Sequence, residues 1–528
     1  MAFTVLQAGT TLYGMDQRGK IVALTLPTGV QLDATLKARF TVSGNDVILV
    51  NSPSRPLAID ANLNVRVLTP DPPALAMTLT GVDAGGLSGT YSARQTYVVM
   101  DADGRLLSES DYGPTAATVT IAAKSLRAAS INLSEDTITG RRLYRPTSGT
   151  AVYFQWVDLD GNEETTIQDD LSDAGLSTFS APARGSAPDL RLIAEFKSRL
   201  YGVDKTAIDD VRYTEVGAPF AWPSDNVLTM PRLGSDAQGV TGLARRRDAL
   251  GVGRSNGFYQ ITGTSDSDLR VTNLSENCGI EAPDSVAVYK DIAYFLWKDG
   301  VYKWDAMGIA SLTDGRIRRW FTQGDTFNIT RLPQAFGLID PIRQKYRLYL
   351  ASAGSVVENC WIEYDLNRKT WWGPHMSHSS KPSSAFLFST SAGAYIPLVG
   401  GDDGYTRMDR KQRFDDLATA IDFDVVLARQ TAGTPLLHKH FGMLSIDAKP
   451  QRRGSLVVQS VAGTVDVLRT AKATHETIVN MTGRASSHAT HRIGDGQACK
   501  VRLRNNQIGA DVNIRSIEID PVFPTGRR

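Results

Sequence analysis

Short alternating strands dominate the pattern of hydrophobic and polar positions along this chain. Apolar stretches of four to seven residues, rich in valine, isoleucine, tyrosine and leucine, stop at glycine, aspartate or asparagine. Stretches of this kind are typical of β-strands bounded by turns. Residues 190–200 could form an amphipathic helix, but they run into Tyr201-Gly-Val and are better interpreted as strand. The sequence therefore predicts an all-β protein.

One unit recurs along the chain: an apolar strand, a tight Asp/Gly turn and a second strand that carries an aromatic residue. The copies are separated by roughly 35 to 50 residues, so the repeat is degenerate. A hairpin of this kind has one apolar face, which repetition around an axis can bury. We therefore predict a β-propeller of about six or seven blades. A stack of ordinary antiparallel sandwiches is the alternative. The copies include Arg199-Leu-Tyr-Gly-Val-Asp, Ile292-Ala-Tyr-Phe-Leu with Asp299-Gly-Val-Tyr-Lys-Trp, and Tyr346-Arg-Leu-Tyr-Leu with Trp361-Ile-Glu-Tyr-Asp.

Two segments interrupt this series and define the expected domains. Residues 75–183 show strand signals at the spacing of an immunoglobulin-like or fibronectin-like β-sandwich. Prolines mark both of its ends: Pro70, Pro72, Pro73, Pro182 and Pro188. Residues 415–528 alternate without the aromatic turn and predict a C-terminal β-sandwich. The first blades are then expected in residues 1–74 and the remaining blades in residues 184–414.

Composition and charge narrow the classes of function. The length of 528 residues predicts several domains, and 42% hydrophobic with 21% charged residues is ordinary for a globular protein. The net charge of +1 argues against a dedicated nucleic-acid binder, which would be distinctly basic. The charge is nevertheless uneven. Residues 85–179 hold 7 basic and 13 acidic residues, a net −6, and residues 421–528 hold 15 basic and 9 acidic residues, a net +6.

The cysteines and the hydropathy indicate where the protein is made. Cys278, Cys360 and Cys499 are an odd number and lie far apart, which argues against a disulfide framework and fits assembly in a reducing cytoplasm. No apolar stretch approaches the length of a membrane span, and the N-terminus lacks the pattern of a secretory signal. We therefore expect no stable membrane insertion.

The chain offers few candidates for catalysis or metal binding. His438 with His440, and His488 with His491, could each supply half of a metal site, but a surface or packing role is favoured for both pairs. The acidic segment Asp158–Glu164 is interpreted as a solvated turn, and whether a cation binds there stays open. Phosphate-loop and His-Glu-x-x-His motifs are absent from the sequence, and the glycine-rich stretch Gly251-Val-Gly-Arg-Ser-Asn-Gly lies between two predicted strands rather than opening a helix. We predict no catalytic residue, no metal and no cofactor.

Basic clusters are the remaining candidate contacts, either with a neighbouring subunit or with DNA phosphates. A subunit contact or a solvated rim is favoured for the first two clusters. They are Arg245, Arg246 and Arg247; Arg316, Arg318 and Arg319 beside Trp320; and Arg452, Arg453, Arg502 and Arg504 in the C-terminal segment.

Several of these segments resemble a family of tail proteins from short-tailed bacteriophages. The resemblance covers residues 190–410 and, less closely, the insertion. It is carried by Phe196-Lys-Ser-Arg-Leu-Tyr-Gly, Gly239-Val-Thr-Gly-Leu, Cys278-Gly-Ile-Glu-Ala-Pro-Asp-Ser-Val and Trp361-Ile-Glu-Tyr-Asp-Leu-Asn-Arg-Lys-Thr-Trp.

The resemblance implies a propeller-bearing tail nozzle, or the related plug that stabilises packaged DNA. Such a protein is not an enzyme. It forms a hexameric ring at the distal end of the virion tail, contacts the adaptor ring and the tail fibre or spike proteins, and lets double-stranded DNA pass without binding it tightly. A near-neutral chain fits that role, because each phosphate contact would slow the moving DNA. A propeller lectin or receptor-binding adhesin is the alternative, and a propeller hydrolase is a third possibility.

Overall fold

The prediction of an all-β protein is confirmed. The computed structural model describes residues 3–51, 55–176, 180–232, 238–377, 380–390, 393–408, 415–416, 419–420, 423–427, 429–432, 437–448, 455–464, 475–480, 487–507, 512 and 514–524. Within these residues it contains 42 strands, three short 3-10 helices and one four-residue α-helix. The chain divides into two compact units, the first of residues 1–375 and 383–400 and the second of residues 376–382 and 401–528. No helix of the described residues is long and apolar enough to cross a membrane.

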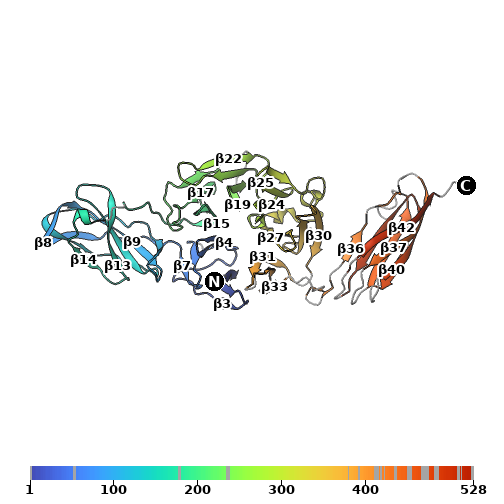
Figure 1. Ribbon diagram of the computed structural model, residues 1–528, viewed down its shortest axis with the longest axis horizontal. Coiled ribbons are helices and arrows are strands. Elements are labelled where there is room, and N and C mark those ends of the chain that lie inside the picture. The colour runs from blue at the N-terminus through green and yellow to red at the C-terminus, as the bar shows by residue number, and fades with distance from the viewer. Residues whose placement is uncertain are drawn as a thin grey trace. The chain divides into compact units, whose positions relative to one another are not determined.

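Seven small antiparallel sheets, here called sheets I to VII, follow one another along the described part of the first unit (Figure 1). Sheet I holds β1 (Phe3–Ala8), β2 (Thr11–Asp16) and β3 (Ile21–Ala23), and sheet II holds β4 (Arg39–Ser43), β5 (Asp46–Val50), β6 (Leu57–Ile59) and β7 (Val65–Val67). Sheet III holds β15 (Leu190–Phe196), β16 (Arg199–Asp204), β17 (Asp210–Tyr213) and β18 (Val227–Thr229). Sheet IV holds β19 (Val240–Arg245), β20 (Leu250–Arg254), β21 (Phe258–Thr262) and β22 (Arg270–Ser275).

The last three sheets repeat the pattern. Sheet V holds β23 (Ala287–Tyr289), β24 (Ile292–Trp297), β25 (Gly300–Asp305) and β26 (Gly308–Ser311). Sheet VI holds β27 (Phe336–Asp340), β28 (Lys345–Leu350), β29 (Cys360–Asp365) and β30 (Thr370–Met376), and sheet VII holds β31 (Pro382–Ser389) and β32 (Tyr395–Gly401). Short helices lie in the connections: η2 (Pro283–Ser285) before sheet V, and α1 (Arg319–Thr322) and η3 (Ile329–Gln334) before sheet VI. The segment 190–200 is indeed two strands and the turn between them.

The turns expected from the Asp/Gly pattern form, and they are held by hydrogen bonds between the aspartate carboxylate and nearby backbone N–H groups. The Asp16 carboxylate accepts the backbone N–H groups of Arg18 and Lys20 at 2.9 and 2.8 Å, and Gly19 takes a φ of 84°. Asp101 accepts two backbone N–H groups in the same way, beside Gly104 at a φ of 76°. Aspartate caps the turn and glycine tolerates the left-handed backbone, so the strands reverse within a few residues.

Neighbouring sheets pack face to face in chain order. Buried clusters join sheet I to II through Leu12 and Leu49, sheet II to III through Ile48 and Leu200, and sheet III to IV through Val203 and Val252, among others. Sheet IV meets sheet V where Phe258 stacks on Phe295 and meets Trp304 edge-on, with ring centroids 5.3 and 5.1 Å apart. Burying side chains of this size contributes about 1.5–3 kcal/mol each.

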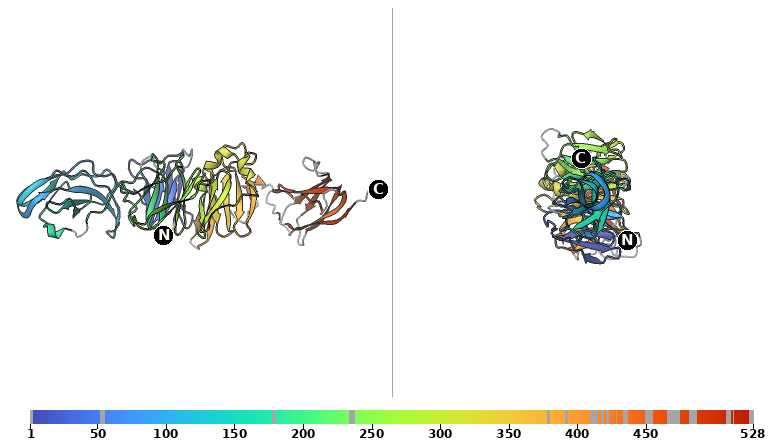
Figure 2. Two further views of the ribbon diagram at one scale, coloured as in Figure 1. Left: turned by 90° about the horizontal axis from the view of Figure 1, so that it is seen from above. Right: turned by 90° about the vertical axis from the view of Figure 1, so that its left-hand side faces the viewer.

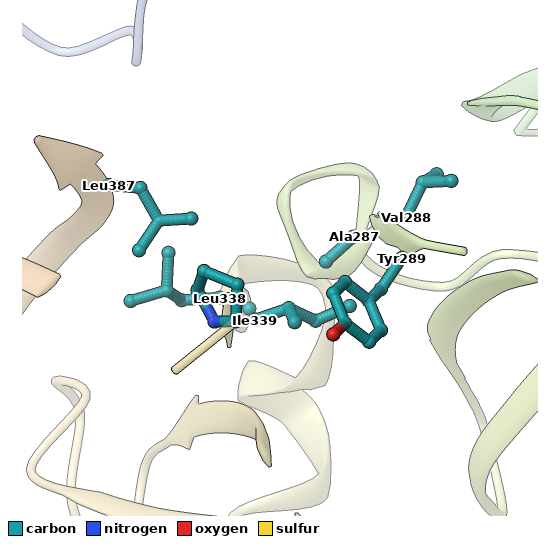
Figure 3. Close-up of a pocket in the computed structure, with 8 residues that line it drawn as sticks. Ala287, Val288, Tyr289, Leu338, Ile339 and Leu387 are labelled. Carbon is teal, nitrogen blue, oxygen red and sulfur yellow. The ribbon is translucent and has the colours of Figure 1, made fainter. Parts of the chain in front are cut away.

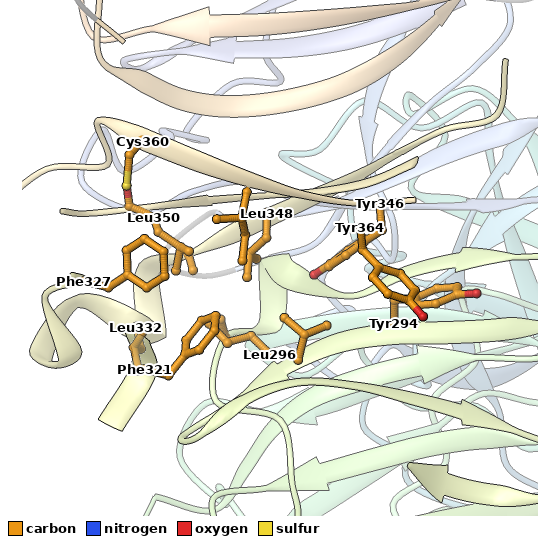
Figure 4. Packing of buried hydrophobic residues seen from close by; sticks show 14 of the residues in the cluster. Tyr294, Leu296, Phe321, Phe327, Leu332, Tyr346, Leu348, Leu350, Cys360 and Tyr364 are labelled. Atoms are coloured by element: carbon orange, nitrogen blue, oxygen red, sulfur yellow. The ribbon is translucent and has the colours of Figure 1, made fainter. Parts of the chain in front are cut away.

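The succession continues to sheet VI, and sheet VII packs on sheet I. Sheets V and VI share the largest of these cores, where Tyr294 stacks on Tyr346 at 5.7 Å (Figure 4). Sheet VII packs on sheet I, because Phe388 and Leu398 enclose Met15. The last sheet of the series therefore contacts the first.

The inserted strands form two sheets with a core of their own. They are β8 (Thr78–Tyr91), β9 (Arg94–Met100), β10 (Leu106–Glu109), β11 (Val119–Ala129), β12 (Gly140–Pro146), β13 (Tyr153–Asp160) and β14 (Thr166–Asp169). The sheet orders are β10-β9-β12-β13 and β14-β11-β8, and the core between them includes Leu126, Leu143 and Trp156. The long strands β8 and β11 bend (Figure 2), in keeping with register shifts between them near residue 124. A 3-10 turn, η1 (Asp173–Gly175), follows β14.

A polar joint ties this inserted module to the chain on both sides. Ser108 Oγ donates to the Leu68 carbonyl at 2.6 Å, and Tyr112 Oη donates to the Pro182 carbonyl at 2.9 Å. The carboxylate of Glu109 accepts Arg184 Nη2 at 2.5 Å. Because Glu109 is fully buried, this pair is shielded from solvent screening.

The second unit is also built from strands. It contains β33 (Thr406–Met408), β34 (Asp415–Asp416), β35 (Thr419–Ala420), β36 (Phe423–Val426), β37 (Lys439–Ala448), β38 (Ser455–Gly463), β39 (His475–Asn480), β40 (Ser487–Gly496), β41 (Ala498–Asn505) and β42 (Ile514–Pro524). Two sheets, ordered β36-β41-β38-β39 and β40-β37-β42, enclose a core with Phe441, Leu456 and Leu503. We refer to these two sheets as the C-terminal sandwich.

Candidate interaction surfaces

The first basic cluster is tied to neighbouring sheets by ion pairs. Arg245, at the end of β19, pairs with Glu195 of sheet III at 2.5 Å. Arg246 pairs with Asp291 of sheet V at 3.1 Å and lies 4.8 Å from the centre of the Trp304 ring. Arg247 is exposed, and its backbone N–H donates to Asp291 at 2.7 Å. This cluster therefore links sheets III, IV and V.

The second cluster lies in the connection between sheets V and VI. Arg318 pairs with Asp299 at 2.8 Å and with Asp314 at 3.6 Å. Arg319 donates to Gln323, and Arg316 donates to the carbonyl of Lys369. All three side chains are exposed to solvent.

The C-terminal cluster is described only in part. Arg502 makes two hydrogen bonds to Asp424, and Arg504 lies 3.6 Å from the same carboxylate. The hydrogen bonds from Arg502 hold the pKa of Asp424 below its usual range. Arg452 and Arg453 lie outside the described residues. Asp424 is one of the nine acidic residues already counted in residues 421–528, so this pairing leaves the net charge of +6 unchanged.

The histidine and acidic side chains considered as metal ligands do not form a metal site in the described part of the chain. Among the described residues, no group of three or more His, Cys, Asp or Glu side chains could hold a metal ion. Asp158, in the predicted acidic turn, instead takes a two-pronged contact from Arg142 at 2.7 and 2.9 Å. His440 pairs with Asp495, and His491 contacts Thr477 Oγ1 at 2.7 Å and Ser460 Oγ at 2.8 Å.

The three cysteines are free and buried. Burial raises the thiol pKa of Cys278 and Cys360 to about 12 and that of Cys499 to about 11. Thiols with raised pKa values carry little thiolate at neutral pH and are poor nucleophiles.

We expect acid to destabilise the C-terminal sandwich through His491, which is 2% exposed. Burial, with a smaller effect of His475, lowers the pKa of His491 below its usual 6.5, so the unfolded chain binds the proton more readily than the folded one. The contribution of neutral His491 to the stability of the folded state is complete above the pKa that this histidine has in the unfolded chain. It is lost as the pH falls from there through the lower pKa of His491 in the folded state. Urea unfolding of the sandwich at about pH 7.5 and pH 5 measures the loss. The substitution His491→Gln should reduce this pH dependence and His438→Gln, at an exposed site, should not. Equal pH dependence in both variants would contradict the assignment.

A polar cluster that the sequence analysis missed lies where several connections of the first unit meet. Lys37 and Arg39, at the start of sheet II, reach Asp284 of η2, which leads into sheet V. Arg39 Nε lies 3.1 Å and Lys37 Nζ 4.0 Å from the Asp284 carboxylate. Lys37 also donates to the Gln334 carbonyl of η3, before sheet VI, at 3.3 Å. Sheet II is thus joined to the connections of sheets V and VI, which do not follow it in the packing order.

Three further residues complete this set, which we call the axial cluster: Lys37, Arg39, Arg191, Arg331, Asp284 and Glu358. Arg331 of η3 pairs with Glu358 at 3.0 Å, and Arg39 Nη1 donates to the Arg191 carbonyl of sheet III at 3.0 Å. Lysine and arginine residues are common throughout the chain. Arg39 and Asp284 lie 245 positions apart, so no local motif could have marked this group.

Two pockets are also formed by residues of the first unit. One of about 230 Å³ opens among the first strands of sheets V, VI and VII, with Leu387 facing Leu338 and Tyr289 (Figure 3). The other, of about 440 Å³, is lined by Glu281, Lys298, Asp299, Phe321, Thr322, Ile329, Thr330 and Leu332. The first pocket is mainly apolar, while the second mixes charged and apolar groups.

Comparisons with known proteins leave the family undetermined. No family profile and no curated protein matches the sequence. Among solved structures, PorZ, a surface component of the type-IX secretion system of Porphyromonas gingivalis, aligns over 76% of this chain at 11% identity and a TM-score of 0.27. The alignment spans about half (52%) of the PorZ chain. Hsv2 of Kluyveromyces lactis aligns over 54% of this chain and 69% of its own, at 7% identity and a TM-score of 0.27. Neither likeness assigns a function.

Proposed function

We propose that this chain is a non-catalytic structural protein of a short bacteriophage tail, the nozzle that forms the distal DNA conduit. In this proposal sheets I to VII are the blades of a seven-bladed β-propeller. The observation that carries the proposal is the succession of small antiparallel sheets, in which sheets I to VI pack one on the next and sheet VII packs on sheet I. Repetition of this kind is how hairpins with one apolar face make a stiff wall.

Charge supports an assembly of several copies. The inserted segment carries net −6 and the C-terminal segment net +6, so opposite surfaces are available between neighbouring copies. Complementary charge of this kind fixes orientation and speeds association. The exposed side chains of Arg316, Arg318 and Arg319 offer a further basic surface to a neighbour or to the adaptor ring.

The axial cluster bears on where DNA would pass. In a seven-bladed ring, sheets V and VI lie across the axis from sheet II, so the Lys37 and Arg39 contacts to Asp284 span the axis at one end. DNA would therefore run through a lumen enclosed by the copies of the ring, and each propeller would form part of its wall.

The mass of the purified protein tests this proposal. We expect six chains of 57.4 kDa in one particle, formed by the protein alone or on addition of the tail adaptor ring. Mass photometry over a range of concentrations measures this directly. A single chain that never assembles, with or without the adaptor, would overturn the nozzle, and sugar binding by that monomer would point instead to a lectin or adhesin.

A further inference from the structure

The axial cluster holds more positive than negative charge. Lys37, Arg39, Arg191 and Arg331 supply four cations, whereas Asp284 and Glu358 supply two carboxylates. Lys37 and Arg39 share one of these carboxylates, Asp284. Two charges are therefore left over within the cluster.

The hydrogen bonds of Arg191 do not remove this surplus. Arg191 directs Nη2 to the backbone carbonyls of Ile208, Gln238 and Val240, which are neutral. Asp209 attracts Arg191 electrostatically, but its carboxylate is engaged by Arg232 and Arg254 at 2.6 and 2.7 Å. Like charges held together in a partly buried place repel one another unless an anion joins them.

The excess of positive charge affects the pKa of Lys37. Burial lowers the pKa of its ammonium group, and the neighbouring Arg39 and Arg331 lower it further, against the opposing attraction of Asp284 and Glu358. The side chain is nevertheless 40% exposed, so its charged end can be reached from solvent. It is held in place by the Gln334 carbonyl and by the Phe336 ring, whose centroid lies 4.7 Å away.

Two donors of the cluster also lack an acceptor. The Nε atoms of Arg191 and Arg331 are buried, and no described protein atom accepts a hydrogen bond from either. Buried donors of this kind are usually satisfied by a bound oxygen. The cluster thus offers surplus charge, an accessible ammonium group and unsatisfied guanidinium donors in one place.

We propose that the axial cluster binds a phosphate group. A phosphate carries up to two negative charges and several acceptor oxygens, which match the two surplus cations and the donors of lysine and arginine. The group could belong to free inorganic phosphate or to the end or backbone of a nucleic acid. The site does not depend on the chain being a tail protein.

Inorganic phosphate is the first probe. Isothermal titration of the full chain with sodium phosphate, at an ionic strength kept constant with sodium chloride, should show binding at one site per chain. The substitution Lys37→Met keeps the apolar stem and should weaken binding about tenfold or more, because it removes a charged hydrogen bond. Lys37→Arg should retain most of the affinity. The matched control is Lys303→Met, a 33% exposed lysine of sheet V that is paired with Asp305, and it should bind phosphate like the wild type.

Some results would overturn the proposal. Equal phosphate binding by the wild type and Lys37→Met would show that phosphate binds elsewhere on the chain. The absence of phosphate binding by the wild type would exclude the site. Circular dichroism and the elution volume establish that Lys37→Met is folded. If it is not, Arg331→Met takes its place with the same expectation.

Short DNA duplexes separate the sources of phosphate. Competition by 5′-phosphorylated duplex alone would assign the site to a phosphate at a DNA end, and equal competition by unphosphorylated duplex would assign it to the backbone. No competition by either, with inorganic phosphate still bound, would assign it to the free ion.

Discussion

Replacing Glu109 by alanine is expected to lower the free energy of unfolding of the inserted module by about 3–5 kcal/mol. The Glu109 side chain is fully buried, and its carboxylate accepts hydrogen bonds from Thr96 at 2.8 Å, Tyr144 at 2.7 Å and Arg184 at 2.5 Å. A second guanidinium, that of Arg142, lies 3.6 Å away. Glu109 is therefore the acceptor on which three donors and a nearby cation converge.

The size of the effect comes from the groups left behind. Without the carboxylate, Arg184, whose side chain is 7% exposed, keeps a buried charge beside the Phe220 ring at 5.7 Å. The hydroxyls of Thr96 and Tyr144 lose their acceptor as well. Removing one partner of a buried pair costs far more than the pair itself contributes.

Thermal unfolding followed by near-ultraviolet circular dichroism measures this loss, with Glu163→Ala as control because Glu163 is exposed on the same module. Protease sensitivity of residues 180–189 gives a second measurement, since Arg184 anchors that connection to Glu109. The interpretation is wrong if the two variants unfold at the same temperature and are cleaved at the same rate.

The sequence predicted those parts of the fold that depend on local chemistry. The alternation of apolar and polar residues predicted strands, and the Asp/Gly pattern of the recurring unit predicted tight turns such as the one that Asp16 and Gly19 form. The aromatic residues of the hairpins, such as Phe258 and Trp304, are now seen to fill the cores between neighbouring sheets. In each case the residue and the feature that it determines lie within a few positions of each other.

The contacts of the charged side chains could not be predicted in the same way. The arginine clusters were recognised as basic, but Arg246 pairs with Asp291 and lies against Trp304, both in another sheet. The partner of a charge depends on which connections the fold brings together, and sequence spacing carries no record of that. For the same reason Lys37 and Asp284 were not recognised as one group.

The substitution Gly279→Ala should destabilise the first unit by about 3 kcal/mol or more, because the new methyl group would overlap a backbone atom. A Cβ on Gly279 would lie 1.8 Å from the carbonyl oxygen of Arg254. That same oxygen accepts the N–H of Ile280 at 3.1 Å. The overlap can be relieved only by moving the segment 278–280 away from sheet IV.

Moving the segment 278–280 away from sheet IV would leave a cavity where Ile280 now packs. Ile280 is fully buried, and its side chain occupies the room left by two glycines of sheet IV. A Cβ on Gly242 would lie 2.5 Å from Ile280, and one on Gly253 would lie 2.4 Å from it. The Gly239-Val-Thr-Gly-Leu and Cys278-Gly-Ile segments, on which the family resemblance rests, are thus two sides of one contact between sheet IV and the connection that leads to sheet V.

Urea unfolding tests this contact, with Gly86→Ala as the matched control. Gly86 has a backbone outside the left-handed region and no heavy atom within 4 Å of its ideal Cβ, so its substitution should leave the midpoint almost unchanged. Ile280→Ala should destabilise the same unit by about 2–5 kcal/mol, since it leaves a cavity over the two glycines. Gly279→Ala adds volume at this contact, and Ile280→Ala removes it. A loss of stability in both variants would therefore show that the fit between Ile280 and sheet IV holds sheets IV and V together. If Gly279→Ala instead unfolds at the midpoint of Gly86→Ala, the segment is free to move and cannot be the element that locks these sheets.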